Sequence, residues 1–462
     1  MFKAAFYETE VTPPLESPIL GHFKPHYGKN VKDRLYTKAV VIDNGIETVA
    51  TVVLDCVHFP LRFHEEIIAR VGEYTGIKPE NITVAANHSH AGAPTRSVPE
   101  IECYTDEGYI NNLIKIMADC ITLAYRNLEP VKVSYACGKV YDISFNRNFV
   151  MRDGSITTNT GRDEDEPAPL NVPDDIPVYK FEDVHNMPGA KIYNPNCVGN
   201  LAGIDPDVPV LMFTNEKGEK IGAVINFACH QTASGGTEFS GDYSSAMSDE
   251  LKKEYGQNFV SLFLIGTCGD INHIDFSRKK CKPDIYKIMG KRLADEVKAV
   301  VKNAVEITDE TLLAKKEKLY INKRHVETEE MIKACENFIK QQTNARKGML
   351  RNMLMAEAVD NDAPVEVYVQ SVRIGDVYFY ALPGEVFVNF GLYIKEKSPG
   401  SKNIITELAN GSSGYIPTRE VFHPNSTLYE KSVTKGTCME IAGGYIISEK
   451  AVELANTLKN QR

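Results

Sequence analysis

The fold is organised around Asn81-Ile82-Thr83-Val84-Ala85-Ala86-Asn87-His88-Ser89-His90-Ala91-Gly92. Its first half is short, apolar and β-branched, which predicts a buried strand, and Gly92 with the following proline predicts a loop. His88 and His90 leave the strand two residues apart, so both imidazoles are expected to face one cleft. A neutral imidazole is a common zinc ligand, and a second histidine beside it can transfer protons. Because His-x-His is a short pattern, two loop histidines without a task are an equally open interpretation.

Length, composition and charge indicate a globular protein. The chain has 462 residues, of which 43% are apolar, and a net charge of −10, which argues against nucleic acid as a partner. It contains no apolar run close to the about 20 residues of a membrane span. Acidic residues at positions 8 and 10 interrupt the place where a signal peptide would carry its apolar core. The ten cysteines are scattered singly, which favours reduced thiols, and we therefore expect a cytoplasmic protein.

Three pairs of β-branched runs surround turn residues and predict β-hairpins. They lie at 38–54 around Asn44-Gly45, at 208–229 around Glu216-Lys217-Gly218, and at 365–382 around Gly375-Asp376. Helical spacing of apolar residues is found at 64–74, 104–128, 244–255, 284–304, 386–395 and 443–458, and further strands are expected at 131–140, 259–265, 312–322 and 403–409. The sequence shows no internal repeat. These patterns predict a mixed α/β (α+β) fold in which residues 1–462 form one large layered domain, with mixed and antiparallel sheets built from hairpins and flanked by helices.

Two segments depart from this pattern. Residues 151–207 are rich in charges and irregularly placed prolines, which predicts a long loop that is either a surface insertion or a substrate lid. Residues from about 325 to 360 predict a helical excursion whose mixed charges are typical of a solvated face.

Four of the predicted strands end in a polar residue suited to metal binding. These residues are His88, His230, Asp270 and Glu385. Strand ends of layered α/β domains are common positions for sites, and two histidines with one glutamate are a ligand set of catalytic zinc. The chain has no His-Glu-x-x-His helix, so these ligands would have to converge from distant segments.

Several short motifs follow one another along most of the chain. They are Ala5-Phe6-Tyr7-Glu8-Thr9-Glu10-Val11-Thr12-Pro13-Pro14, Asn87-His88-Ser89-His90-Ala91-Gly92, Asn226-Phe227-Ala228-Cys229-His230-Gln231-Thr232, Ser240-Gly241-Asp242, Gly269-Asp270, Pro383-Gly384-Glu385 and Gly414-Tyr415-Ile416-Pro417-Thr418. In this order they resemble the motifs of the neutral/alkaline non-lysosomal ceramidase family, whose members are zinc-dependent amidases that hydrolyse the N-acyl bond of ceramide.

The resemblance implies a site and a cofactor. A Zn²⁺ ion would be held by His88, His230, Glu385 and Tyr415, with His90 beside it as a proton carrier. Asn146-Arg147-Asn148 and Tyr429-Glu430 resemble two further family motifs, which implies that Arg147 and Tyr429 face the scissile group and stabilise its oxyanion. Asp242 and Asp270 would either orient the ring nitrogens of the ligating histidines or cap turns.

The resemblance also has departures. Asn272 stands where the family commonly has a serine that has been considered as a nucleophile, which favours attack by metal-activated water. The chain ends soon after the last motif, so we expect the C-terminal β-sandwich domain of full-length ceramidases to be absent.

The expected function is therefore hydrolysis of an amide bond in a small or lipid-like N-acyl compound by a zinc-dependent amidohydrolase, which would serve lipid or sphingolipid metabolism if the substrate is ceramide. The same metal site acting on an ester, a lactam or a sugar-linked amide is an alternative, and so is a metal-binding protein without catalysis.

Overall fold

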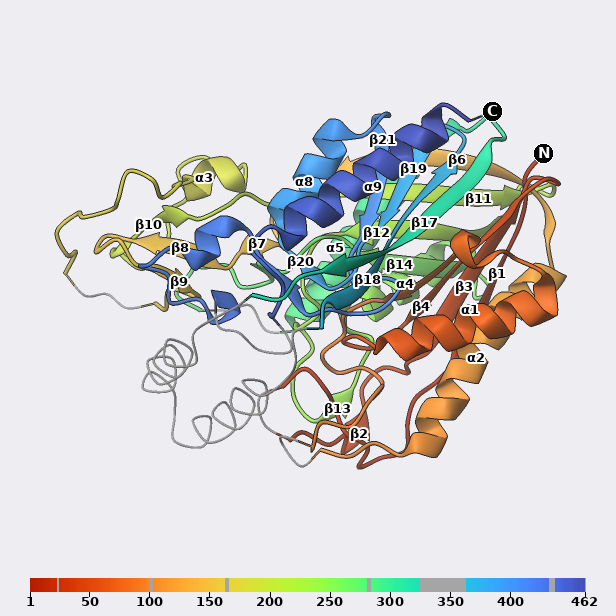
Figure 1. Ribbon diagram of the computed structural model, residues 1–462, viewed down its shortest axis with the longest axis horizontal. Helices are drawn as coiled ribbons and strands as arrows, with labels where there is room; N and C mark the ends of the chain where they lie inside the picture. Colours follow the sequence, from red (N-terminus) through yellow and green to blue (C-terminus); the bar gives the residue numbers. More distant parts are fainter. Residues whose placement is uncertain are drawn as a thin grey trace.

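Sheets covered by pairs of helices make up most of the chain in the computed structural model (Figure 1). The structure describes residues 1–22, 25–99, 103–162, 166–280, 284–324, 363–431 and 437–461. The predicted helical excursion at about 325–360 lies outside these residues. The mixed α/β class predicted from the sequence is confirmed.

One arrangement of strands and helices occurs three times. In each repeat, three successive strands pair antiparallel, a helix follows, a fourth strand pairs parallel with the third, and a second helix completes the unit. The first repeat contains β1 (Lys3–Glu10), β3 (Tyr36–Asp43), β4 (Thr48–Leu54), α1 (Leu61–Thr75), β5 (Ile82–Ala86) and α2 (Glu107–Arg126). The second contains β6 (Glu129–Lys139), β11 (Asp207–Asn215), β12 (Lys220–Phe227), α4 (Asp242–Tyr255), β14 (Val260–Ile265) and α5 (Ile285–Val300). The third contains β17 (Leu312–Ile321), β18 (Val365–Ile374), β19 (Val377–Ala381), α8 (Val388–Lys397), β21 (Lys402–Thr406) and α9 (Gly443–Lys459).

This repetition lies in the topology of strands and helices, and it is compatible with a sequence that shows no internal repeat. The three predicted hairpins are the second and third strands of the three repeats. Their turns contain residues suited to tight reversal: Gly45 has a φ of 84° and Gly375 a φ of 59°, both in the region that favours glycine.

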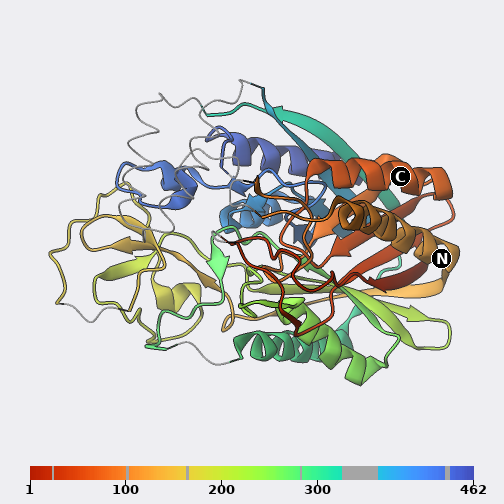
Figure 2. The same cartoon turned by 90° about the horizontal axis from the view of Figure 1, so that it is seen from below.

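The core follows from the alternation of side chains along the strands. Val40 and Ile42 point to a central cluster, whereas Ala39 and Val41 on the same strand point to the helices. The central cluster combines the inner faces of all three repeats, including Leu211, Leu262 and Phe379. Figure 2 shows the three helix pairs, α1 with α2, α4 with α5, and α8 with α9, arranged around the sheets. The sheets of the first two repeats are joined by the short pairing of β1 with β6, which makes one nine-stranded sheet in which β16 also pairs with β6.

Short elements fill the connections. Residues 151–207, predicted as a long loop, contain β9 (Ile156–Thr158), α3 (Phe181–Val184) and β10 (Cys197–Asn200), and both strands pair with β8 (Asn148–Met151) in a small sheet at one end of the molecule (Figure 1). The remaining elements are β2 (Asn30–Val31), β7 (Phe145–Asn146), β13 (Glu238–Phe239), β15 (Ile271–Asn272), β16 (Val305–Glu306), β20 (Glu385–Val386), β22 (Tyr415–Ile416) and the 3-10 turns Pro79–Asn81, Val301–Asn303, Arg419–Phe422 and Tyr429–Lys431.

Glu385 directly precedes residues 386–395, for which the sequence predicts a helix. It lies in β20, which pairs in parallel with β22 so that Glu385 is opposite Tyr415, and α8 begins three residues later at Val388. Within the described residues, no helix is long and apolar enough to cross a membrane.

Candidate metal centre

The ends of strands from all three repeats meet at one buried point. His88 follows β5 of the first repeat, His230 follows β12 of the second, and Glu385 follows β19 of the third. Their exposed fractions are 0%, 2% and 8%, so the three side chains are enclosed by protein. In each repeat the third and fourth strands are parallel, and their carboxyl ends therefore open toward the same edge. Three of the four predicted ligands are thus brought together from positions that are far apart along the chain, and the fourth, Tyr415, lies opposite Glu385 in a short strand pairing.

His88 has a strained backbone. Its φ is 70°, in the left-handed region that a residue other than glycine occupies at a cost of about 1–3 kcal/mol. Such strain persists only where surrounding contacts impose it, and it is concentrated at functional sites. The conformation turns the chain directly after β5 and directs the imidazole inward.

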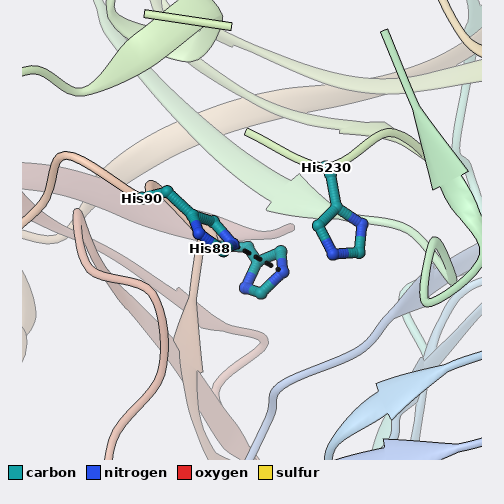
Figure 3. A group of neighbouring side chains, drawn as sticks. All are labelled: His88, His90 and His230. Carbon is teal, nitrogen blue, oxygen red and sulfur yellow. Dashed lines mark hydrogen bonds between the residues drawn. The ribbon is translucent and has the colours of Figure 1, made fainter. Parts of the chain in front are cut away.

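The three imidazoles face one another (Figure 3). The ring centroids of His88 and His230 are 4.4 Å apart, and those of His88 and His90 are 4.7 Å apart. One ligand atom of each of the three histidines lies within 4.8 Å of those of the other two.

A backbone carbonyl fixes the tautomer of each ring. Nδ1 of His88 is 2.8 Å from the carbonyl oxygen of Val57, and Nδ1 of His230 is 2.7 Å from that of Cys268. Nδ1 of His90 is 3.1 Å from the carbonyl oxygen of Gly21. Because a carbonyl only accepts, each Nδ1 carries a proton, and in its neutral form a ring of this tautomer presents an unprotonated Nε2 to the centre.

The resulting atoms are all acceptors, and their spacing fits a metal ion. Nε2 of His88 and Nε2 of His230 each lie 3.4 Å from Oε2 of Glu385, and Nε2 of His88 lies 3.4 Å from Nε2 of His90. Ligands about 2.1 Å from a tetrahedral zinc are separated by about 3.4 Å from one another. Among the described residues, Nε2 of His230 and Oε2 of Glu385 are buried and have no hydrogen-bond partner, as expected of atoms that would bind a cation.

Burial and neighbouring charges tune these groups toward metal binding. Burial, reinforced by His88, lowers the pKa of His230 to about 4, and burial also lowers the pKa of His90 well below its ordinary value. Burial opposes ionisation of Glu385, but His88 and His230 outweigh it and hold the pKa of Glu385 well below its usual range. Neutral imidazoles and an ionised carboxylate are the protonation states that ligate a metal.

A group of hydrogen-bond donors adjoins the acceptors. Nη2 of Arg147 lies 2.5 Å from the hydroxyl of Tyr429 and 2.7 Å from the carbonyl oxygen of Gly269, and Tyr429 donates in turn to the hydroxyl of Tyr415 at 2.9 Å. Arg147 also forms a buried ion pair with Glu430 at 2.8 Å. Burial raises the pKa values of Tyr415 and Tyr429, so both are neutral phenols in this arrangement.

Asp242 and Asp270 bind backbone and amide groups of nearby loops. They do not orient the candidate ligating histidines, because the Nδ1 atoms of those rings donate to backbone carbonyl oxygens. Asp242 accepts from the backbone N–H groups of Ser234 and Tyr243, and Asp270 accepts from Val388 at the start of α8 and from the amide of Asn146. Burial raises the pKa of both carboxyls to about 6.

A buried polar network beneath the histidines was not predicted from the sequence. The Asn87 amide donates to Asp55 at 2.6 Å and to Ser244 at 3.2 Å, and the Gln231 amide donates to the Asn87 carbonyl oxygen at 2.7 Å. Asn87 precedes His88 and Gln231 follows His230, so these bonds fasten the two histidine segments together. The sequence offered one signal for this network, which is that Asn87 and Gln231 are direct chain neighbours of the two histidines.

Asn272, at the position of the family serine, is engaged elsewhere. Its amide nitrogen lies 3.0 Å from the side-chain oxygen of Asn159, and its amide oxygen accepts from the backbone of Ile274 at 2.8 Å. The contact with Asn159 ties the end of this strand to the 151–207 segment.

Fold and site together define a mixed α/β protein with a buried candidate metal centre of histidine and carboxylate acceptors. Residues 11–152 match the model of the family described as neutral/alkaline non-lysosomal ceramidase, N-terminal. This match, with the relatives that follow, confirms the resemblance to that family. It covers His88, His90 and Arg147, whereas His230, Glu385 and Tyr415 lie beyond it.

Relatives of known structure extend the comparison. A neutral ceramidase of Pseudomonas aeruginosa is 23% identical over 176 residues, which are 37% of this chain and 20% of the relative, so the aligned region spans about a fifth of that protein. A crystal structure of neutral ceramidase from the same species superposes over 99% of this chain and 74% of its own with a TM-score of 0.71 at 17% identity. A structure described as ceramidase complexed with C2 superposes with a TM-score of 0.69 over 99% of this chain and 75% of its own, also at 17% identity. At these identities the structural likeness establishes the fold.

Proposed function

We propose that this chain is a zinc-dependent hydrolase that cleaves the N-acyl bond of an amide. The observation that carries the proposal is the convergence of unprotonated Nε2 atoms and a carboxylate at 3.4 Å spacings in a buried site. The resemblance to the ceramidase family supports the choice of reaction.

Four side chains would hold the ion: His88, His230, Glu385 and Tyr415. When bound, zinc supplies Lewis acidity and lowers the pKa of a coordinated water from about 15.7 to about 7. His90 is an alternative fourth ligand, because its Nε2 points at Nε2 of His88. The three imidazoles need no tautomer change to present their Nε2 atoms.

The residues beside the acceptors would perform the remaining steps. Arg147 and Tyr429 are donors that would bond the oxygen on which negative charge develops, a role worth roughly 3 kcal/mol per well-placed donor. His90, whose Nδ1–H is held by the Gly21 carbonyl oxygen, would first accept a proton from the attacking water on its unprotonated Nε2 and would then pass that proton to the departing amine. The Glu430 carboxylate orients the Arg147 guanidinium toward the site.

The substrate class is proposed from the family resemblance as a small or lipid-like N-acyl compound, with ceramide as one candidate. The same centre could equally serve an ester, a lactam or a sugar-linked amide, because ligand set and oxyanion donors suit all carbonyl hydrolyses. Cys56, Cys229 and Cys268 are buried and carry free thiols, which supports the proposal of a cytoplasmic location.

The test compares the zinc-loaded protein with His88→Ala on a panel of ceramides, soluble N-acyl amides and esters. His185→Phe is the matched control, because His185 is buried and its ring packs against Phe145 and Phe181, outside the cluster of His88, His90 and His230. Activity that is lost in His88→Ala and retained in the control is expected. Full activity in His88→Ala would remove the metal-hydrolase proposal, and cleavage of soluble amides without cleavage of ceramide would retire its lipid version.

A further inference from the structure

Glu407 is a completely buried carboxyl group that no motif identified. It directly follows β21, the fourth strand of the third repeat, and its exposed fraction is 0%. Burying a carboxyl group is costly unless its oxygens are hydrogen-bonded, so its partners indicate what it does.

The partners of Glu407 are two segments of the candidate metal centre. Its Oε2 accepts from the backbone N–H of Cys268 at 3.0 Å and from that of Val386 at 2.7 Å. Its Oε1 lies 3.1 Å from Sγ of Cys268. One oxygen therefore joins two loops that are more than a hundred residues apart in the sequence.

Each loop holds a candidate ligand. The Cys268 carbonyl oxygen receives the Nδ1 proton of His230, so the position of this peptide sets the direction of the His230 ring. Val386 is bonded to Glu385 in β20, whose pairing with β22 brings Tyr415 opposite Glu385. Gly269 directly follows Cys268, and its carbonyl oxygen accepts a hydrogen bond from Nη2 of Arg147.

The threefold topology gives this position a context. Buried polar residues follow the third and fourth strands of every repeat: Asp55 and Asn87 in the first, His230 and Asp270 in the second, and Glu385 and Glu407 in the third. By the strand registers, Glu407 directly follows the fourth strand of its repeat as Asn87 does in the first, and Asn87 likewise fastens neighbouring segments by hydrogen bonds.

We propose that Glu407 is a positioning residue of the metal centre, which sets the separation of His230 and Glu385 by accepting hydrogen bonds from both of their loops. This inference rests on the proposed metal site and deepens it. Burial raises the pKa of Glu407 well above its ordinary range, so a neutral amide is a close mimic of this side chain.

The experiment compares Glu407→Ala with Glu407→Gln. The glutamine keeps an oxygen that can accept from both N–H groups while its NH₂ group faces Sγ of Cys268, whereas the alanine removes both bonds. Zn²⁺ affinity is measured by competition with a chromophoric chelator, and the visible absorption of the Co²⁺-loaded protein reports ligand geometry. Ile404→Ala is the matched control, because Ile404 is buried on the same strand but packs in the central apolar cluster.

Glu407→Ala is expected to weaken Zn²⁺ binding about 10–100-fold, the usual effect of removing a group that orients ligands, and to change the Co²⁺ spectrum. Glu407→Gln is expected to bind as the unmodified protein does, and Ile404→Ala is expected to lose thermal stability without losing affinity. Equal affinities for Glu407→Ala and the unmodified protein would overturn the inference, as would a loss in Ile404→Ala as large as that in Glu407→Ala. Failure of the unmodified protein to bind Zn²⁺ would instead overturn the proposed function.

Discussion

The ion pair between Arg147 and Glu430 offers a test of the site that needs neither metal nor substrate. The exposed fractions of the two residues are 7% and 0%, and Nη2 of Arg147 lies 2.8 Å from Oε1 of Glu430. Burial raises the pKa of the Glu430 carboxyl while Arg147 acts in the opposite direction. Replacing Arg147 by methionine leaves this carboxyl buried without its cation, and losing one partner of a buried pair costs about 3–5 kcal/mol.

The size of the protein converts this cost into a temperature shift. A specific unfolding entropy of about 2.1 cal/mol/K per residue gives about 1 kcal/mol/K for this chain, so Arg147→Met is expected to lower Tm by about 3–5 °C. Arg147→Met/Glu430→Leu removes both charges and is expected to recover more than half of that shift, because apolar replacement of a whole buried pair is nearly neutral.

Differential scanning calorimetry in the presence of a chelator measures both shifts without a contribution from bound metal. Glu430→Leu alone completes the double-mutant cycle and isolates the coupling between the two side chains. A double variant whose Tm is no higher than that of Arg147→Met would refute this account of the pair. An Arg147→Met variant with an unchanged Tm would refute it as well.

Four further outcomes are expected. Zinc at 1,000 times its Kd should stabilise the folded chain by about 4 kcal/mol, which is a rise in Tm of about 4 °C that a chelator reverses; no rise would indicate no specific site. Tyr429→Phe should lower kcat on a cleaved amide about 10²–10³-fold while zinc content stays constant, and an unchanged kcat would exclude Tyr429 as an oxyanion donor. Burial lowers the pKa of His185 to about 4 from 6.5, so the unfolded chain binds the proton more tightly and stability falls as the pH drops from 6.5 toward 4. At pH 5 this loss is about 2 kcal/mol, so His185→Phe should lose correspondingly less stability between pH 7 and pH 5, and equal losses would contradict the assigned burial. Gly21 has a φ of 87°, and a Cβ at this position would lie 2.6 Å from Nδ1 of His90. Gly21→Ala should therefore lower Tm by about 1–3 °C and should also lower hydrolytic activity. A variant with unchanged Tm and activity would show that the Gly21 contact does not position His90.

The hairpins and the positions of the histidines were accessible from the sequence because their signals are local. Asn44-Gly45 between two β-branched runs predicts a reversal whatever the rest of the chain does. The placement of His88 and His230 after apolar strands predicts a shared edge. Convergence itself was a hypothesis until the strand order was known.

Features that depend on long-range pairing were not predictable in the same way. Glu385 precedes apolar residues with helical spacing, yet Glu385 and Val386 pair with β22. The pairing partner of Glu385, Tyr415, lies 30 residues further along the chain, so a local pattern does not reveal it. The threefold repeat is carried by topology, and its members share no sequence pattern that would reveal it. Glu407 lies within an apolar run and has no motif, so its role is visible only through its contacts with Cys268 and Val386.

The central claim is that residues from three topological repeats form one metal site with nitrogen and oxygen ligands. X-ray absorption of the zinc-loaded chain, with the metal content measured on the same sample, tests it most directly. We predict one zinc per chain with nitrogen and oxygen neighbours at about 2.0–2.1 Å, and loss of that zinc in His230→Ala. A chain that binds no zinc, or zinc with sulfur neighbours at about 2.3 Å from its cysteines, would contradict the account.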